Sequence, residues 1–517
     1  MSEILASLPA YLTAHLQLSL MALATGGLIS VPLGIFAARH ARLESGALAL
    51  ASIAQTIPSL ALLALMVPLL ASLSAVSSRL LGIEVPSIGF LPAWIALSLY
   101  SILPMLRNTV TGLAGVDPAL IEAARGVGMT ERQCLVRVEL PLALPVIVAG
   151  IRTATIWVVG TATLATPVGA TSLGNFIFSG LQTRNLAAVV VGSIAAAGLA
   201  LALDGVIRTV ERGLQQRRRG WWGGGLTVLA GLYLWVGWTL LPTPGTTGRV
   251  IAIGSKNFTE QYVLAALLAA EVTADDGPPV RQVQSLGSTV AFDALRGGEI
   301  DLYVDYSGTI WATILKRQGL PQDRSRVLAE ATEELASGFD IEVLATLGFE
   351  NTYALAMREP DAAGEGVASL SDLARRSRSW VMAADYEFFA RAEWKALEER
   401  YGLGFAEERS MDPALMYSAI AEGEVDVISA FSTDGRIATL GLRLLRDDLG
   451  VIPPYDAIVL ARPGFRRQWP AVAERVGGLS GRIDASAMQQ MNREVDQEGH
   501  TPRAVAEAFR AQVLESR

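Results

Sequence analysis

The sequence predicts an all-α polytopic membrane domain of about six transmembrane helices, followed by a two-lobed α/β domain. The first observation behind this prediction is an uneven division of charge. Residues 1–247 contain 14 arginines, no lysine and nine acidic residues, whereas residues 248–517 have a net charge of −13, which gives −8 for the whole chain. The second is a change of pattern, from long apolar stretches to alternating strands, turns and amphipathic helices. A chain of 517 residues has room for two or three domains.

The apolar stretches of the first half are long enough to cross a bilayer, which needs about 20 residues per helix. They are rich in Ala, Leu, Val and Gly, and small residues allow close helix packing in lipid. Interior prolines predict kinks, because neighbouring helices can satisfy the freed backbone groups. The expected spans are residues 15–38, 48–72, 88–106, 142–167, 186–207 and 225–241, with kinks at Pro32, Pro58, Pro104 and Pro145.

The arginines predict the orientation of these spans. They gather in alternate loops, with Arg79 and Arg184 as the exceptions, and positively charged loops face the cytosol. The N-terminus and everything after the sixth span are therefore expected outside. The predicted location is the inner (cytoplasmic) membrane, with a multi-pass chain in the lipid bilayer and an extracytoplasmic C-terminal domain. No cleavable signal peptide is expected, because a basic start and a small-residue cleavage site are missing.

A polar segment, EAARGVGMTERQCLVRVELP, lies between the third and fourth spans. Its spacing is Glu-Ala-Ala, three residues, Gly, nine residues, an aliphatic residue, one more, then Leu-Pro. A short helix with a glycine break and small residues can seat closely in a groove of another protein. The residues expected to contact that partner are Glu122, Ala123, Ala124, Gly128, Leu140 and Pro141.

This spacing resembles the loop by which permeases of ATP-binding-cassette (ABC) importers contact their ATPase. The resemblance implies a transporter subunit that is not an enzyme, with residues 119–141 as a cytoplasmic docking loop. It also implies a homodimer in the membrane and cytosolic ABC ATPase subunits that use ATP and Mg²⁺. No phosphate-binding G-x-x-x-x-G-K-[ST] loop occurs in the sequence, so no cofactor is expected in this chain. An ordinary loop with a helix-forming EAA triplet is the alternative.

The second half predicts a mainly parallel α/β fold from Arg249 onward. Residues 292–301 and 417–426 align without gaps at an offset of 125. In both, a helix ends at Gly and feeds a strand, expected at 300–304 and 425–430. Two similar lobes with a ligand cleft between them are the economical interpretation. The alternative is that Gly-Glu-aliphatic-Asp is simply a frequent turn between a helix and a strand.

Four segments of the second half, GSKNFTEQ, YVDYSGT, FSTDGRI and PPY, resemble the solute-binding proteins of quaternary-amine ABC importers, which are type II periplasmic binding proteins. Those systems serve glycine betaine, choline, carnitine and related osmoprotectants, and some relatives take ergothioneine. The first half resembles their permeases. The implied domains are a permease domain over 1–220, a sixth span with its linker over 221–248, and a solute-binding domain over 249–517, with lobe 1 at about 249–350 and 456–517 and lobe 2 at about 351–455.

A trimethylammonium group has charge but no N–H, so ring faces worth about 0.5–2 kcal/mol each must recognise it. Three or four rings supply roughly 2–8 kcal/mol, against about 8 kcal/mol for micromolar affinity, so a second anchor is expected. Tyr417 as a core side chain and Arg391 as a solvated helix charge are alternatives. The residues that the resemblance and this requirement indicate are Tyr306, Tyr353, Tyr417 and Tyr455 for the cage, Lys256, Thr309 and Arg391 for an anionic tail, and Asn351 for a hydrogen bond.

Other function classes fit the sequence less well. The three histidines, His15, His40 and His500, lie far apart, so no His-based metal or nucleophile site is expected. The single cysteine, Cys134, excludes an internal disulfide and a Cys-rich metal site. The arginines at 208–219 lie beside a span and indicate topology, so no nucleic acid is expected. A ligand-gated sensor or channel would need no docking loop and usually carries a cytosolic output domain. An ATP-independent carrier is a further alternative.

Overall fold

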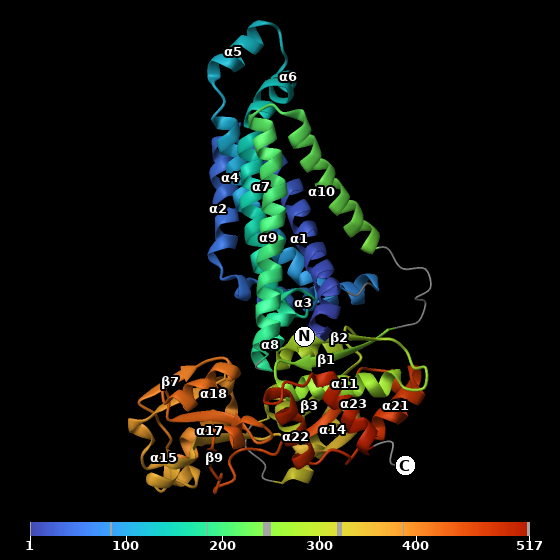
Figure 1. Ribbon diagram of the computed structural model, residues 1–517, viewed down its shortest axis with the longest axis vertical. Helices are drawn as coiled ribbons and strands as arrows, with labels where there is room; N and C mark the ends of the chain where they lie inside the picture. The colour runs from blue at the N-terminus through green and yellow to red at the C-terminus, as the bar shows by residue number, and fades with distance from the viewer. Residues whose placement is uncertain are drawn as a thin grey trace. The chain divides into compact units, whose positions relative to one another are not determined.

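The computed structural model describes residues 2–82, 85–183, 185–240, 250–317, 323–385 and 387–513. The predicted linker at 242–248 lies outside these residues. The chain divides into two units, residues 1–177 with 187–247 and residues 178–186 with 248–517. The first unit is helical throughout its described part, and the second is α/β (Figure 1).

The first unit consists of long apolar helices joined by short segments. A π-helical turn, Leu135–Glu139, leads into α7, and a 3₁₀ turn, Thr163–Val168, follows it. The helices are α1 (Ser2–Ala37), α2 (Ala41–Thr56), α3 (Ser59–Leu81), α4 (Phe90–Ala114), α5 (Pro118–Gly126), α6 (Glu131–Cys134), α7 (Leu140–Ala162), α8 (Gly174–Gln182), whose residues from 178 onward belong to the second unit, α9 (Leu186–Gln215) and α10 (Arg219–Leu240).

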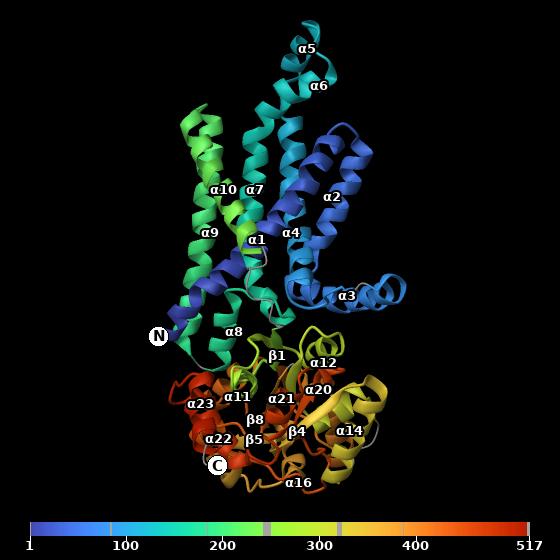
Figure 2. The same ribbon diagram turned by 90° about the vertical axis from the view of Figure 1, so that its right-hand side faces the viewer.

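The span predicted at 48–72, with a kink at Pro58, corresponds to two helices. Helices α2 and α3 meet at a bend of 98°, so that α3 lies nearly at right angles to α2 (Figure 2). The break comes at Ile57, whose extended backbone (φ −71°, ψ 127°) is the conformation that a following proline imposes. Pro58 therefore separates two helices, whereas Pro32, Pro104 and Pro145 lie inside continuous ones.

Helices long and apolar enough to cross a membrane are found at four of the six predicted positions. The bent pair α2–α3 can supply a fifth. Helix α10 covers most of the predicted sixth span but is not one of these helices in the described part of the chain. The four are Leu5–Ala37, Phe90–Ala114, Glu131–Val168 and Leu186–Gln215.

Glycines let α1 and α7 approach α4 closely. A Cβ atom added to Gly26 of α1 would lie 1.7 Å from Ser101 Oγ, and one on Gly150 of α7 would lie 2.8 Å from the Pro104 carbonyl oxygen. Neither place admits a larger side chain without movement of the helices. The packing follows the rule for lipid, where small residues bring helix backbones together.

A charged cluster joins α7 to α9. Arg152 of α7 pairs with Asp204 of α9 through Nε, and its Nη1 lies 3.4 Å from Glu211 Oε2. Charged groups within apolar helices are unfavourable unless they are paired. The cluster therefore stabilises one arrangement of the two helices.

Replacing Arg152 by leucine is expected to lower the unfolding free energy by roughly 1–3 kcal/mol, because Asp204 and Glu211 lose their cation. Thermal unfolding of the detergent-solubilised protein measures the change. Arg208, an exposed residue of α9, supplies the control substitution Arg208→Leu, which is expected to leave the unfolding temperature nearly unchanged. Equal unfolding temperatures for both variants would contradict a stabilising role of the cluster.

The second unit contains two five-stranded mixed sheets with the same strand arrangement. Their orders are β2-β1-β3-β10-β4 and β7-β6-β8-β5-β9. In each sheet the first three strands are parallel, and the fourth is antiparallel to both neighbours. The strands are β1 (Ile251–Lys256), β2 (Val280–Leu286), β3 (Leu302–Tyr306), β4 (Glu342–Glu350) and β10 (Asp456–Ala461) in one sheet, and β5 (Tyr353–Arg358), β6 (Val381–Ala384), β7 (Glu407–Ser410), β8 (Val427–Phe431) and β9 (Leu442–Leu444) in the other.

The expectation of a mainly parallel fold is therefore wrong for half of the strand pairs. The antiparallel strands, β5 and β10, are those that the chain enters as it passes from one sheet to the other, so no helical crossover precedes them. We name the sheet of β1–β4 and β10 with its helices lobe 1, and the sheet of β5–β9 with its helices lobe 2. The chain crosses between the lobes at residues 351–352 and again between β9 and β10.

The internal repeat is confirmed. The two central strands, β3 and β8, are related by the predicted offset of 125, and each follows a helix, α12 or α18. Both strands occupy the middle of their sheets. The helices of this unit are α11 (Thr259–Thr273), α12 (Ser288–Arg296), α13 (Ser307–Thr309), α14 (Arg324–Phe339), α15 (Glu359–Gly364), α16 (Leu370–Ala374), α17 (Ala392–Tyr401), α18 (Pro413–Glu422), α19 (Arg436–Thr439), α20 (Phe465–Gln468), α21 (Pro470–Gly477), α22 (Ala485–Asp496) and α23 (Pro502–Val513).

Candidate functional site

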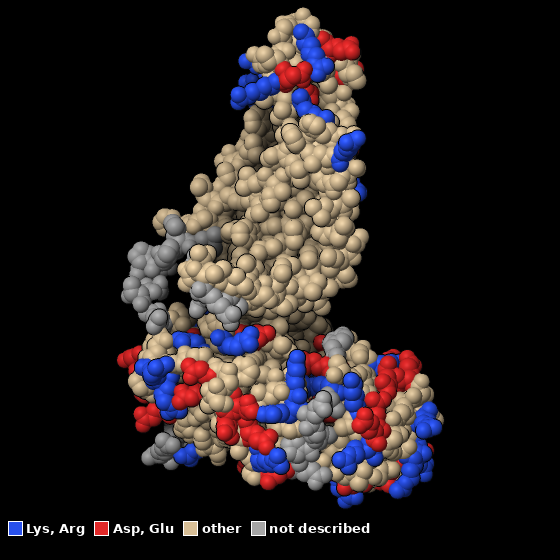
Figure 3. Space-filling model, turned by 180° about the vertical axis from the view of Figure 1, so that it is seen from behind, with Lys and Arg blue, Asp and Glu red and all other residues tan. Residues whose placement is uncertain are grey.

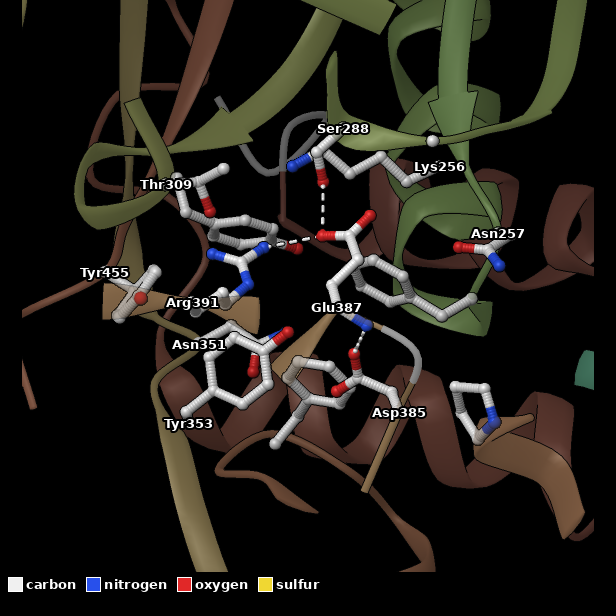
Figure 4. A pocket seen from close by; sticks show the side chains of 15 residues that line it. Lys256, Asn257, Ser288, Thr309, Asn351, Tyr353, Asp385, Glu387, Arg391 and Tyr455 are labelled. Atoms are coloured by element: carbon white, nitrogen blue, oxygen red, sulfur yellow. Dashed lines mark hydrogen bonds and ion pairs between the residues drawn. The ribbon is translucent and has the colours of Figure 1, made fainter. Parts of the chain in front are cut away.

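A cavity of about 150 Å³ lies between the lobes, at the carboxyl ends of their parallel strands (Figure 4). Lys256 ends β1, Tyr306 ends β3, Asp385 follows β6 and Phe431 ends β8. Ligands of open α/β sheets bind at such strand ends. The lining residues are Lys256, Asn257, Phe258, Gly287, Ser288, Tyr306, Thr309, Asn351, Tyr353, Asp385, Glu387, Arg391, Pro413, Phe431 and Tyr455.

The structure brings most of the predicted binding residues together in this cavity, although they come from both lobes and from the crossing at residue 351. Of the eight predicted residues, those that line the cavity are Lys256, Tyr306, Thr309, Asn351, Tyr353, Arg391 and Tyr455.

Tyr417 is the exception, and its predicted place in the cage needs correction. Its side chain is 1% exposed and packs with Met416, Ile420 and Ile428 in the core of lobe 2. The Arg436 guanidinium lies 3.8 Å from the centre of the Tyr417 ring, and the ring does not line the cavity. Helix α18 covers the lobe 2 sheet, and only its first residue, Pro413, reaches the cavity.

The cavity wall contains a continuous set of aromatic rings from both lobes. The Phe258 ring stacks on Tyr306 with centroids 6.3 Å apart and on Phe431 with centroids 5.5 Å apart. The Tyr353 ring lies 4.8 Å from Phe431 and 5.9 Å from Tyr455. The sequence analysis missed Phe258 and Phe431. Phe431 could have been found, since it is the repeat partner of Tyr306 at the offset of 125.

Two of these rings present their faces to cations. Lys256 Nζ lies 5.3 Å from the centre of the Tyr306 ring, and the central guanidinium carbon of Arg391 lies 5.1 Å from the centre of the Tyr353 ring. Both distances are within the range of about 6 Å for a cation–π contact. In both contacts the cation is a side chain of the protein itself.

The cavity also contains anionic groups. Arg391 Nη2 lies 2.8 Å from Glu387 Oε2, and the same oxygen accepts a hydrogen bond from Ser288 Oγ at 3.3 Å (Figure 4). Burial raises the pKa of the Asp385 carboxyl. The sequence analysis missed both acids, because nothing in the segment after β6 distinguishes them from surface charges. With charges of both signs in its wall, the cavity is suited to a zwitterion.

Lys256 has a partner beneath the cavity. Its Nζ lies 2.5 Å from Asp305 Oδ1, and both side chains are buried. Asp305 also accepts a hydrogen bond from Tyr303 Oη at 2.7 Å. No group of three metal-binding side chains placed to hold an ion occurs in the described part of the chain.

The predicted docking segment forms a helical hairpin at one end of the helical unit (Figures 1 and 2). Asp117 caps α5, whose first residue is Pro118, and a capping box of Thr130 and Gln133 starts α6. Between the two helices Gly128 has a φ of +86°, a conformation that favours glycine.

Most of the predicted docking residues are accessible on this hairpin. Ala124 is buried and Leu140 is half-buried, while Glu122, Ala123, Gly128 and Pro141 are exposed. On the face that Figure 3 shows, charged side chains of the helical unit gather at the end that carries α5 and α6.

Comparison with known proteins decides the family. Residues 249–512 match the substrate binding domain of the ABC-type glycine betaine transport system, and residues 30–216 match the inner membrane component of binding-protein-dependent transport systems. The chain belongs to this ABC importer family. It is a permease fused to a substrate-binding domain, and the predicted fold class and transport function are confirmed at this level.

One relative of this importer matches both domains. The ergothioneine transport permease/ergothioneine binding protein EgtU of Helicobacter pylori (strain G27) is 29% identical over 493 residues, which cover 93% of this chain and 85% of the relative.

Other relatives match one half each. The choline transport system permease protein OpuBB of Bacillus subtilis (strain 168) is 41% identical over 200 residues, 39% of this importer chain and 85% of the relative. The carnitine transport binding protein OpuCC of Listeria monocytogenes is 29% identical over 269 residues, 51% of this chain and 87% of the relative.

Proposed function

We propose that this importer subunit carries a small quaternary amine that also bears a carboxylate. The observation that supports this best is the cavity wall, which brings the rings of Tyr306, Tyr353 and Tyr455 together with the guanidinium group of Arg391. A trimethylammonium group needs ring faces because it cannot donate an N–H hydrogen bond. A carboxylate needs a guanidinium or ammonium group, which Arg391 and Lys256 supply.

Each residue of the site has a role in this proposal. Tyr306, Tyr353 and Tyr455 surround the cation, and Arg391 with Lys256 holds the carboxylate. Thr309 and Asn351 hydrogen-bond the remaining polar atoms. Glycine betaine, carnitine and ergothioneine fit this chemistry, whereas choline lacks the carboxylate. Two of the relatives are named for carnitine and ergothioneine, which carry both groups, and one is named for choline, which carries only the quaternary amine.

The rest of the proposed importer follows from its family and its charges. Two copies of the permease domain form the pore, and the substrate-binding domain lies on the extracytoplasmic side of the inner membrane. Separate ABC ATPase subunits bind the hairpin at 119–141 in the cytosol and use ATP and Mg²⁺, so this chain needs no cofactor of its own. The arginines in alternate loops and the absence of a phosphate-binding loop from the sequence support this arrangement.

A ligand panel on the full-length protein in detergent tests the proposal. Glycine betaine, carnitine, choline and ergothioneine are each added in a thermal unfolding assay and in calorimetry. At a concentration of about 100 times Kd a bound amine adds about 2.7 kcal/mol to the unfolding free energy. Stabilisation by at least one carboxylated amine supports the proposal, and no response to any of the four overturns it.

Replacing Arg391 by glutamine is expected to weaken recognition of the ligand's carboxylate and to leave recognition of its trimethylammonium group nearly unchanged. A hydrogen bond to a charged group contributes about 1.5–3 kcal/mol, so affinity for carboxylated amines falls by at least about tenfold. Affinity for choline changes by less than about threefold, because the cage retains its rings. Isothermal titration calorimetry measures both.

The matched control for this substitution is Arg409→Gln, which changes an arginine of lobe 2 that pairs with Glu407 away from the cavity. It is expected to bind every amine as the wild type does. Equal losses for choline and for the carboxylated amines in Arg391→Gln would contradict the assigned role of Arg391.

A further inference from the structure

The carboxylate of Glu260 lies behind the aromatic wall of the cavity, where the two lobes meet. Its side chain is 2% exposed and belongs to the first turn of α11. Each oxygen accepts two hydrogen bonds. Oε1 accepts from Tyr306 Oη at 2.5 Å and from Asn351 Nδ2 at 2.9 Å. Oε2 accepts from Thr433 Oγ1 and from Asn492 Nδ2 at 3.3 Å.

These four donors come from four separate parts of the second unit. Tyr306 ends the central strand of lobe 1, and Asn492 lies on α22. Asn351 belongs to the crossing between the lobes, and Thr433 follows β8 of lobe 2. One carboxylate is thus hydrogen-bonded to both lobes and to the segment about which they would turn.

Glu260 has this position without a cationic partner. No ion pair to it occurs among the described residues, and burial raises the pKa of its carboxyl. A buried carboxylate is unfavourable unless hydrogen bonds replace its hydration. Four hydrogen bonds replace that hydration here, so the buried acid depends on donors from both lobes.

The carboxylate acts on residues that line the cavity, although Glu260 is not one of the lining residues. The Tyr306 hydroxyl donates to Glu260 and accepts a hydrogen bond from Gln261 Nε2 at 3.1 Å, so it is held from two sides. Asn351 donates to Glu260 through its amide nitrogen, which leaves its buried Oδ1 without a hydrogen-bond partner among the described residues. Glu260 thereby fixes the orientation of both.

We propose that Glu260 is the positioning residue that couples closure of the lobes to binding of the cation. The hydrogen bond from Thr433 joins lobe 2 to this carboxylate of lobe 1, and domain closure in two-lobed proteins occurs about such crossing segments. The same carboxylate then holds Tyr306 and Asn351 in the cavity wall. The binding part of this inference rests on the proposed function, and the closure part does not.

Glu260→Gln tests the closure part in the ligand-free protein. A glutamine side chain offers one acceptor oxygen and places its NH₂ group against either Asn351 or Asn492, so the four hydrogen bonds to the carboxylate cannot all re-form. Spin labels on the full-length chain, at Ser337 of lobe 1 and Glu399 of lobe 2 in a Cys134→Ser background, report the distance between the lobes. We expect Glu260→Gln to shift this distance distribution to longer values and to broaden it.

The matched control is Glu271→Gln. Glu271 lies on the same helix, is buried, and pairs with Arg510 within lobe 1. Its loss lowers the unfolding temperature and is expected to leave the distance distribution unchanged. Thr433→Val removes only the donor of lobe 2, so it is expected to lengthen the distance while Tyr306 and Asn351 keep their bonds to Glu260. If Glu260→Gln does not fold, Thr433→Val decides, and an unchanged distribution in that variant overturns the proposal.

The second arm measures binding of glycine betaine and ergothioneine by calorimetry. Affinity for whichever amine the wild type binds is expected to fall by at least about tenfold in Glu260→Gln and to stay within about threefold in Glu271→Gln, where tenfold corresponds to about 1.4 kcal/mol. If the wild type binds neither amine, the proposed substrates are wrong while the distance arm still tests Glu260. Wild-type distances together with wild-type affinity in Glu260→Gln would overturn the inference.

Discussion

Replacing Tyr306 by alanine is expected to weaken binding of the quaternary amine by at least about tenfold. Tyr306 is the last residue of β3. Its ring lines the cavity, and Lys256 Nζ lies 5.3 Å from the ring centre. Its removal eliminates a cation–π contact of about 0.5–2 kcal/mol and the stacking on Phe258, worth about 0.5–1.5 kcal/mol. Calorimetry of the full-length protein with glycine betaine, carnitine and ergothioneine measures the loss.

A substitution at a second buried tyrosine distinguishes loss of the binding site from loss of packing in the core. Tyr262 is 3% exposed, lies on α11 and hydrogen-bonds Ser285, away from the cavity. Tyr262→Ala is expected to lower the unfolding temperature about as much as Tyr306→Ala and to keep the affinity. If Tyr306→Ala binds the amine as tightly as the wild type does, Tyr306 is not part of the cage.

Gly128→Trp is expected to abolish ATP-driven uptake and to leave amine binding intact. Gly128 is exposed between α5 and α6, and a Cβ atom added there meets no other atom within 4 Å. The indole therefore has room on this chain but fills the space that a docked ATPase would occupy. Uptake of radiolabelled amine by proteoliposomes that contain the ATPase subunits measures the effect.

The strain of this substitution needs its own control, because Gly128 has a φ of +86° and a side chain in the left-handed region costs about 1–2 kcal/mol. Gly402 has a φ of +69°, is exposed at the end of α17, and also has open space around an added Cβ atom. Gly402→Trp brings similar strain without touching the hairpin and is expected to keep normal uptake. Normal uptake by Gly128→Trp would place the docking surface elsewhere.

The architecture could be predicted from the sequence wherever a sequence pattern has a single physical cause. Apolar length predicts helices that cross a bilayer, and the 125-residue repeat predicts two lobes with β3 and β8 at their centres. The break at Pro58 was predicted only as a kink, because sequence shows that Ile57 must be extended but not how far the next helix turns away. β5 and β10 are each antiparallel to their neighbours because the chain enters a new sheet at each of them. No local sequence pattern indicates where the chain crosses between the sheets.

The site was predictable where its residues end central strands or belong to distinctive segments. Tyr306 and Tyr455 line the cavity and Tyr417 does not, because Tyr417 lies on the side of α18 that packs in the lobe 2 core and the sequence of a short helix does not show which side that is. Glu387 and Glu260 were missed for a different reason. Their roles depend on partners far away in the chain, such as Ser288 for Glu387 and Thr433 for Glu260.

The π-helical turn at Leu135–Glu139 gives the fixed spacing of the docking hairpin a further meaning. A π turn contains about one residue more than an α turn, and one residue of an α-helix corresponds to about 100° of rotation. The interval between Gly128 and Leu140 therefore sets an angle as well as a length. Because the extra residue is contained within one turn, deleting it would rewind the turn as α-helix and leave α6 on about the same side of the α7 axis, whereas deleting one residue from a regular α-helix would rotate it by about 100°. The π turn thus lets the chain hold one more residue between Gly128 and Leu140 without turning α6 away from its side of α7.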